Sequence, residues 1–165
     1  MKKRYAVAFT GPSNSGKTTL IEKVARELIK TNRVAIIKHD PKDKATFDVE
    51  GKDSYKFSQT GAEVVVASSK RTTYLSQREK SLDEIIDMLE DFDYLLVEGL
   101  KSLPLPRIAI FRDSIEESYF NYSEAMATDD SIDIDSYEIP NSIDILDLNS
   151  TEDIISWIKT NSKEI

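Results

Sequence analysis

The sequence predicts an α/β protein built around a mainly parallel central sheet. Short apolar runs of strand length alternate with segments in which apolar residues recur at helical spacing. The first strand, helix and second strand follow one another within residues 5–37, the length of a βαβ unit with a right-handed crossover. The composition, 39% hydrophobic and 32% charged, is typical of a folded soluble protein. We therefore expect a single three-layer domain over residues 1–165.

The chain begins with a strand, a glycine-rich loop and a helix. Residues 5–10 form a continuous apolar run, as expected of a strand buried on both faces. A helix begins near Lys17, and residues 34–37 predict a second buried strand. The helix carries an apolar stripe on its inner face, which consists of Leu20, Ile21, Val24, Leu28 and Ile29.

The middle of the chain has a different pattern. Residues 39–51 are polar and charged without periodicity, which predicts a loop near the upper length for a segment with no function of its own. Beyond the loop we expect a helix over residues 53–60 and strands over residues 64–67 and 72–75, with the two strands paired across a polar turn.

The remaining elements complete the alternation of strands and helices. Ser81, with Glu84 three residues later, forms a capping box that opens a helix. Ser150 or Thr151 can cap the last helix. We expect strands over residues 94–97, 108–111 and 125–127 and the last helix over residues 151–160.

The charge and the hydropathy exclude several classes of protein. The formal net charge is −8, from 22 basic and 30 acidic side chains, so nucleic acid is not an expected partner. No apolar run reaches the roughly 18 residues that span a bilayer, and the basic start lacks the apolar region of a signal peptide. We therefore expect a cytoplasmic protein with no membrane partner. The absence of cysteine excludes disulfides and thiolate metal sites.

Residues 11–18, Gly-Pro-Ser-Asn-Ser-Gly-Lys-Thr, match the P-loop or Walker A pattern. Its glycines allow backbone conformations that a Cβ would block, so that successive N–H groups surround phosphates at the start of a helix. Lys17 would contact the β- and γ-phosphates, and the Thr18 hydroxyl would coordinate Mg²⁺. The match follows a buried strand and opens an amphipathic helix, which is the context that a P-loop requires. The sequence therefore predicts a P-loop NTPase that holds a purine nucleoside triphosphate through Gly11, Asn14, Ser15, Gly16, Lys17, Thr18 and Thr19.

Magnesium at a P-loop also needs a carboxylate from a neighbouring strand end. Glu98 follows the strand over residues 94–97, whereas Asp93 precedes it. Because ligands of open α/β sheets bind outside the carboxyl ends of strands, Glu98 is favoured over Asp93. Asp40, which follows the strand over residues 34–37, is a second candidate metal ligand. Lys17 and Glu98 are the candidate catalytic residues.

The residues alone leave the chemistry open. His39, the only histidine, lies at a strand end beside the expected phosphate site and fits a structural role as well as a functional one. The arginines after the P-loop form no tight cluster in sequence, which favours a slow hydrolase or switch over a small-molecule kinase, the alternative reading. A GTPase that delivers metal to another enzyme would need a metal site shared between chains, since one histidine and no cysteine are available.

Several blocks in a fixed order resemble the molybdopterin-guanine dinucleotide biosynthesis adaptor family, MobB. The P-loop is generic, and residues 51–56 taken alone could bind an anion but fit an ordinary helix entry better. In this order and spacing, however, Gly-Lys-Asp-Ser-Tyr at 51–55 and Val-Glu-Gly-Leu-Lys at 97–101 are much more specific. Residues 37–39, 60–62 and 110–113 carry further likeness, which runs from Val7 to about Trp157.

This resemblance implies a GTP-binding protein with weak GTPase activity, usually a homodimer. It would act beside the guanylyltransferase that joins GMP to molybdopterin. Residues 51–55 would shape the site or contact the pterin, and Lys101 would also gain a role. The family's base-binding loop fits Thr128-Asp129, where Asp129 would accept from guanine N1 and N2 and select GTP over ATP. The chain departs from the family after His39, where members commonly have further histidines and this chain has Asp40-Pro41-Lys42-Asp43.

Overall fold

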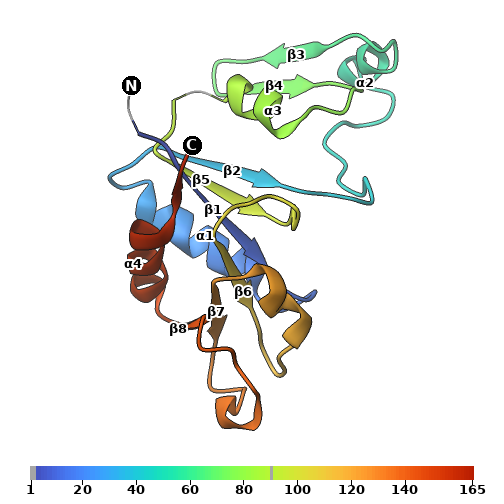
Figure 1. Ribbon diagram of the computed structural model, residues 1–165. Coiled ribbons are helices and arrows are strands. Elements are labelled where there is room, and N and C mark those ends of the chain that lie inside the picture. The colour runs from blue at the N-terminus through green and yellow to red at the C-terminus, as the bar shows by residue number, and fades with distance from the viewer. Residues whose placement is uncertain (1–2, 90) are drawn as a thin grey trace. The chain divides into compact units, whose positions relative to one another are not determined.

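A computed structural model describes residues 3–89 and 91–165 and divides the chain into two compact units (Figure 1). The first unit comprises Met1–His39 and Asp91–Ile165, and the second comprises Asp40–Glu90. The expectation of a single domain stays a prediction.

The first unit is built on a seven-stranded sheet with the order β2-β5-β1-β6-β7-β8, in which β9 pairs with β1. Every pair along this order is parallel, and only the pair of β1 with β9 is antiparallel. The predicted α/β fold with a mainly parallel sheet is thereby confirmed. The strands are β1 (Tyr5–Thr10), β2 (Val34–Lys38), β5 (Tyr94–Glu98), β6 (Arg107–Ile110), β7 (Ala125–Thr128), β8 (Asp144–Asp147) and β9 (Lys163–Glu164).

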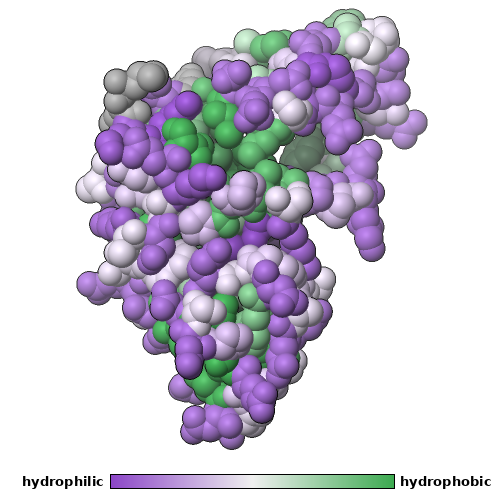
Figure 2. Space-filling view, in the orientation of Figure 1, coloured by the Kyte–Doolittle hydropathy of each residue, from purple (hydrophilic) through white to green (hydrophobic). Residues whose placement is uncertain are grey.

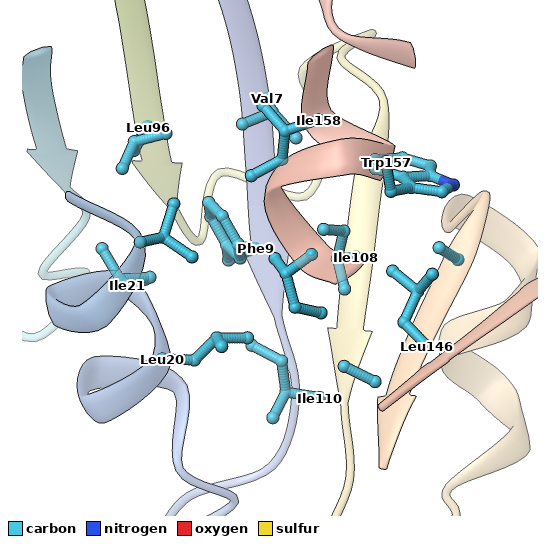
Figure 3. Packing of buried hydrophobic residues seen from close by; sticks show 14 of the residues in the cluster. Val7, Phe9, Leu20, Ile21, Leu96, Ile108, Ile110, Leu146, Trp157 and Ile158 are labelled. Carbon is cyan, nitrogen blue, oxygen red and sulfur yellow. The ribbon is translucent and has the colours of Figure 1, made fainter. Parts of the chain in front are cut away.

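Helices α1 (Lys17–Leu28) and α4 (Thr151–Asn161) cover one face of this sheet (Figure 1). Alternate residues of the central strands, such as Val7 and Phe9 of β1, point into a core that Leu20 of α1 and Ile158 of α4 fill (Figure 3). Trp157 joins this core, and its indole N–H donates to the Asp144 carboxylate of β8 at 2.7 Å. Four residues of the stripe expected on α1 are buried, whereas the fifth, Ile29, follows the end of the helix and is 63% exposed.

A second apolar cluster covers the opposite face of the sheet. Phe111 and Met126 contribute from the sheet side, and Tyr119 contributes from the 3₁₀-helix η1 (Glu117–Tyr122). The rings of Phe111 and Tyr119 meet edge to face at 5.7 Å between centroids. Ile132 and Ile143, which flank the 3₁₀-helix η2 (Ile134–Ser136), complete the cluster. The sheet therefore lies between two apolar layers.

The second unit consists of an antiparallel hairpin and two short helices. Strand β3 (Val64–Ala67) pairs with β4 (Thr72–Leu75), and the helices are α2 (Asp53–Ser58) and α3 (Leu82–Met88). The capping box predicted at the start of α3 is present, because Ser81 and Glu84 accept from each other's backbone N–H groups. Ser58 is the one buried residue of this unit among residues 40–89. Figure 2 shows apolar side chains among the polar ones on its surface, and the largest exposed ones are Phe47, Val49, Phe57, Val65, Val66 and Met88.

The structure adds elements that the sequence pattern did not indicate. Strand β8 and the short strand β9 were not expected, and neither was η1. Strand β6 begins at Arg107 and ends at Ile110, one residue earlier at each end than predicted. Within the described ranges, no helix is both long and apolar enough to cross a membrane.

Candidate nucleotide-binding site

The predicted P-loop connects β1 to α1 and adopts backbone conformations that require its glycines. Gly11 has a φ of 143°, and a Cβ added to it would lie 2.3 Å from the carbonyl oxygen of Ile110. Gly16 caps α1 in the left-handed region with a φ of 94°, and Asn14 is left-handed as well, with a φ of 64°. Because neither glycine position tolerates a side chain without strain or clash, the backbone itself lines the loop.

The start of α1 provides free donors at this loop. The first helical hydrogen bond is from the Leu20 N–H to the Gly16 carbonyl, so the N–H groups of residues 17–19 point beyond the helix end. No acidic residue lies in the first turn. Thr18 and Thr19 are exposed, and Ser15 is buried with a hydroxyl that has no hydrogen-bond partner among the described residues. This arrangement suits an anion at the helix N-terminus.

Lys17 folds back over the loop. Its ammonium donates to the carbonyl oxygens of Gly11 at 2.9 Å and Pro12 at 2.6 Å. Burial lowers the pKa of Lys17, the charges of Lys38 and Lys101 lower it further, and Glu98 opposes them by raising it. Lys17 therefore lies within electrostatic range of Glu98 and of two further lysines, Lys38 and Lys101. This concentration of positive charge is what a polyanion would neutralise.

Glu98 lies at the carboxyl end of β5, next to β1, where its register partner is Phe9. Its side chain is only 16% exposed and pairs with the Lys38 ammonium at 3.1 Å. Glu98, Lys38 and Thr18 line one open groove of about 500 Å³. Asp93 lies at the other end of the same strand and accepts from the Arg33 N–H at 2.7 Å. The structure therefore brings Glu98, and not Asp93, to the groove that Thr18 lines.

The residues after β2 belong to different parts of the chain. Asp40 is in the second unit, where its carboxylate accepts from the N–H groups of Lys44 and Ala45. Its assignment as a magnesium ligand stays a prediction. His39 is in the first unit, where its backbone N–H donates to the Glu98 carbonyl oxygen and its side chain packs against Gly99. This contact gives His39 a structural reason to be close to Glu98.

A buried arginine binds the backbone of the loop that follows Glu98. Arg107 is 1% exposed, and its guanidinium donates to the carbonyl oxygens of Gly99, Leu100 and Leu103. Lys101 leaves this loop and lies over the Tyr119 ring, with its ammonium 4.2 Å from the ring centroid. The backbone that carries Glu98 and Lys101 is therefore fixed by contacts within the first unit.

On the other side of the P-loop, Asp129 follows β7 and is engaged with its own chain. Its carboxylate accepts from the hydroxyl and the N–H of Ser131 and from Nε of Arg112 at 3.0 Å. The two hydrogen bonds from Ser131, followed by the charge of Arg112, hold the pKa of Asp129 below its usual value. Reading of a guanine base by Asp129 stays a prediction, and in this structure both carboxylate oxygens already have donors.

The residues present fit a magnesium nucleotide. Oxygen ligands are what Mg²⁺ prefers, and it is usually bound by one or two protein groups together with substrate phosphates. The Thr18 hydroxyl and the Glu98 carboxylate, which line the same groove, supply such a pair. No cluster of three or more His, Cys, Asp or Glu suited to a metal occurs in the described part of the chain. A metal held mainly by a bound nucleotide is therefore better matched than a metal held by the protein alone.

Two cations near the loop received no role from the sequence. Lys38 pairs with Glu98, and the guanidinium of Arg112 lies beside Gly16. Both follow or end a predicted strand, on the edge of the sheet where ligands bind. The sequence therefore places both residues at this edge of the sheet. It does not show that they approach residues 11–18, because they are far from the P-loop along the chain.

Comparison with known proteins identifies relatives across most of the chain. Residues 6–129 match the protein family described as Molybdopterin guanine dinucleotide synthesis protein B, MobB. The Molybdopterin-guanine dinucleotide biosynthesis adapter protein of Haemophilus influenzae is 33% identical, over 93% of this chain and 86% of the relative. The adapter protein of the same name from Escherichia coli is 29% identical, over 92% and 90% of the two chains.

A solved structure agrees with these sequence relatives. The crystal structure of a molybdopterin-guanine biosynthesis protein B superposes with a TM-score of 0.72 at 25% identity, covering 94% of this chain and 98% of the other. The family match includes the P-loop, Glu98 and Asp129, and the structural likeness includes both units. The chain belongs to the MobB family of molybdopterin guanine dinucleotide synthesis proteins.

Proposed function

We propose that this protein binds GTP with Mg²⁺ at its P-loop and serves as an adapter in the synthesis of molybdopterin guanine dinucleotide. It would act in the cytoplasm, as a homodimer, beside the guanylyltransferase that joins GMP to molybdopterin. The observation that carries the nucleotide part is the P-loop at the start of α1, where Lys17 lies near the ion pair of Lys38 and Glu98. Family membership supports the pathway.

The loop would hold the phosphates, and the residues beside it would hold the metal ion. The backbone N–H groups from Asn14 to Thr19 surround the phosphates, and Lys17 exchanges its carbonyl partners for phosphate oxygens. The Thr18 hydroxyl and the Glu98 carboxylate hold Mg²⁺, which supplies charge neutralisation at the terminal phosphates. Lys38 pairs with the Glu98 carboxylate at the groove that both side chains line.

A nucleotide competition series tests the proposal. GTP, ATP and GMP are titrated calorimetrically in the presence of Mg²⁺, with and without the guanylyltransferase. We expect tight GTP binding, weaker ATP and GMP binding, and association with the transferase. Equal affinity for ATP and GTP, together with no association, would sink the adapter proposal.

Lys17→Ala is the matched test of the site. We expect triphosphate binding to fall at least 100-fold, because a charge-assisted contact to two phosphates is lost. Lys70→Ala, an exposed lysine in the turn between β3 and β4, is the control and should bind as the wild type does. Wild-type affinity in Lys17→Ala would contradict the site assignment.

The role of Glu98 separates slow hydrolysis from binding. Glu98→Gln keeps the side chain's shape and removes its charge, so magnesium-dependent GTP hydrolysis should fall further than GTP affinity does. Unchanged turnover would point to Asp40 as the metal ligand. A phosphorylated metabolite produced from a substrate panel would instead favour the small-molecule kinase.

A further inference from the structure

Arg112 lies against the backbone of the P-loop. It follows the carboxyl end of β6, the strand that pairs with β1. A methyl group placed on Gly16 would be 3.7 Å from one terminal nitrogen of Arg112 and 4.0 Å from the other. The guanidinium therefore lies beside Gly16, the N-cap residue of α1, at a distance where even a methyl side chain on that residue would touch it.

The position of Arg112 is opposite to that of the predicted metal ligand. In the sheet, β5 lies on one side of β1 and β6 lies on the other. Glu98 ends β5, and Arg112 follows β6. The P-loop that leaves β1 is thus flanked by a carboxylate on the β5 side and by a guanidinium on the β6 side.

The terminal nitrogens of Arg112 are available to a ligand. Nε donates to Asp129 at 3.0 Å, and within residues 3–89 and 91–165 the two terminal nitrogens have no hydrogen-bond partner. The side chain is 44% exposed, whereas Asp129 is 15% exposed and is fixed in turn by Ser131. Four N–H groups of one guanidinium are therefore free, next to the loop, on a side chain held at its base.

We propose that Arg112 contacts the bound nucleotide, donating from its terminal nitrogens to the α- and β-phosphates on the β6 side, and that Asp129 is its positioning residue. This inference rests on the proposed nucleotide binding at the P-loop. The planar fork of a guanidinium matches pairs of phosphate oxygens, and the backbone at Gly16 is the part of the loop where phosphates are held. The purine base is then read by other groups, since Asp129 is occupied with Arg112 and Ser131.

Arg112→Gln and Arg112→Lys test the contact by calorimetry with magnesium and GTP, ATP or GDP. We expect Arg112→Gln to weaken all three nucleotides about tenfold, the usual effect of losing a hydrogen bond to a charged group. The ratio of GTP to ATP affinity should not change. Arg112→Lys should lose less, because it keeps the charge and loses only the paired geometry.

Arg33→Gln is the control variant. Arg33 is 50% exposed and pairs with one carboxylate, Asp91, at 3.3 Å, but it lies before β2 at the opposite end of the sheet from the P-loop. Its loss removes one similar positive charge and should leave nucleotide affinity within twofold of the wild type. Circular dichroism confirms that each variant is folded.

Asp129→Asn tests the positioning role, with the ratio of GTP to ATP affinity as the readout. We expect a two- to threefold loss for both nucleotides and an unchanged ratio. A lost GTP preference would show that Asp129 reads the base and would overturn its positioning role. Wild-type affinity in Arg112→Gln, or a loss for GTP but not ATP, would overturn the phosphate contact. A wild-type protein that binds no nucleotide would instead refute the proposed function and this inference together.

Discussion

The two units of the molecule are stabilised in different ways. Every fully buried apolar side chain among the described residues lies in the first unit, from Val7 of β1 to Ile158 of α4. Of residues 40–89 in the second unit, only Ser58 is buried, while Phe47 is 83% exposed and Val65 is 60% exposed. Apolar burial is the main favourable term in folding, so the first unit has a core, whereas residues 40–89 form none of their own.

The second unit is held by local contacts instead. Glu63 pairs with Lys80, whose ammonium lies 5.4 Å from the centroid of the Tyr74 ring, and Arg78 pairs with Glu84. Exposed ion pairs contribute only about 0–1 kcal/mol each. Regions with few buried apolar contacts open at lower free energy than packed cores. The P-loop thus lies in the first unit, which has a packed core. The family-specific block at residues 51–55 lies in the second unit, which we expect to open at lower free energy.

The largest contrast is expected from one substitution made in each unit. Gly11→Ala must place a Cβ 2.3 Å from a carbonyl oxygen, whereas a Cβ at Gly61 meets nothing within 4 Å. Both positions have positive φ, so both carry backbone strain of roughly 1–3 kcal/mol. We expect Gly11→Ala to cost about 3 kcal/mol or more in urea unfolding and to abolish nucleotide binding. Gly61→Ala should cost less and leave binding intact, and equal effects would break the comparison.

A matched pair of valines tests the core directly. Val7 of β1 is fully buried, and Val65 of β3 is 60% exposed. Val7→Ala should cost about 2–3 kcal/mol, since two methyl groups and their packing are lost. Val65→Ala should cost less than about 1 kcal/mol, the range of strand propensity. Denaturant titration of both variants measures the difference, and a large loss at Val65 would show that its side chain is covered in solution.

The two serine caps distinguish global from local stability. Ser150 accepts from the Asp153 N–H at the start of α4, and Ser81 accepts from the Glu84 N–H at the start of α3. Removal of either cap should cost about 1 kcal/mol. Ser150→Ala should lower the global unfolding free energy, because α4 packs on the core. Ser81→Ala should instead speed amide hydrogen exchange in residues 82–88 and leave the global unfolding free energy unchanged. If Ser81→Ala lowered the global unfolding free energy and Ser150→Ala did not, the two units would not differ in stability as described.

The smallest effect is the pH dependence that Glu84 gives to helix α3 of the second unit. The Ser81 backbone N–H, with Arg78, lowers the pKa of Glu84 to about 2 from a model-peptide value of 4.5. A depressed carboxyl pKa stabilises the folded state above the unfolded pKa, and this contribution disappears as the pH falls toward about 2. Amide protection of α3 should therefore decline between about pH 4.5 and pH 2. Glu84→Gln should remove that decline, which NMR-detected exchange can follow; an identical decline in the variant would exclude Glu84 as its source.

The two units also differ in how far the sequence predicts them. The buried strands, the P-loop and the stripe of α1 have strong periodicity, because each must bury a defined face. The capping box at Ser81 is equally local and was predicted correctly, and of the two caps expected for the last helix, Ser150 or Thr151, the structure uses Ser150. Strand β8 was missed because Asp-Ile-Leu-Asp is an edge strand in which only Leu146 is buried, so it carries almost no apolar signal.

The site was predictable in its contiguous motif and at one carboxylate that ends a predicted strand. Residues 11–18 form one motif, and Glu98 follows from the rule that ligands bind at strand ends. The approach of Arg112 to Gly16 and its pairing with Asp129 depend on the sheet order, which brings β1, β6 and β7 together. No periodicity in a single sequence encodes that order.

Trp157 makes the difference between the units visible to an optical experiment. It is the only tryptophan of the chain, and it is buried in the core of the first unit with its indole bonded to Asp144. Its fluorescence will therefore report the melting of the first unit and will be insensitive to the hairpin and to α3. Far-ultraviolet circular dichroism senses the backbone of both units. If the two signals change at different denaturant concentrations, the protein unfolds in more than one step. A fluorescence curve alone would then follow only the unfolding of the first unit, which carries the P-loop.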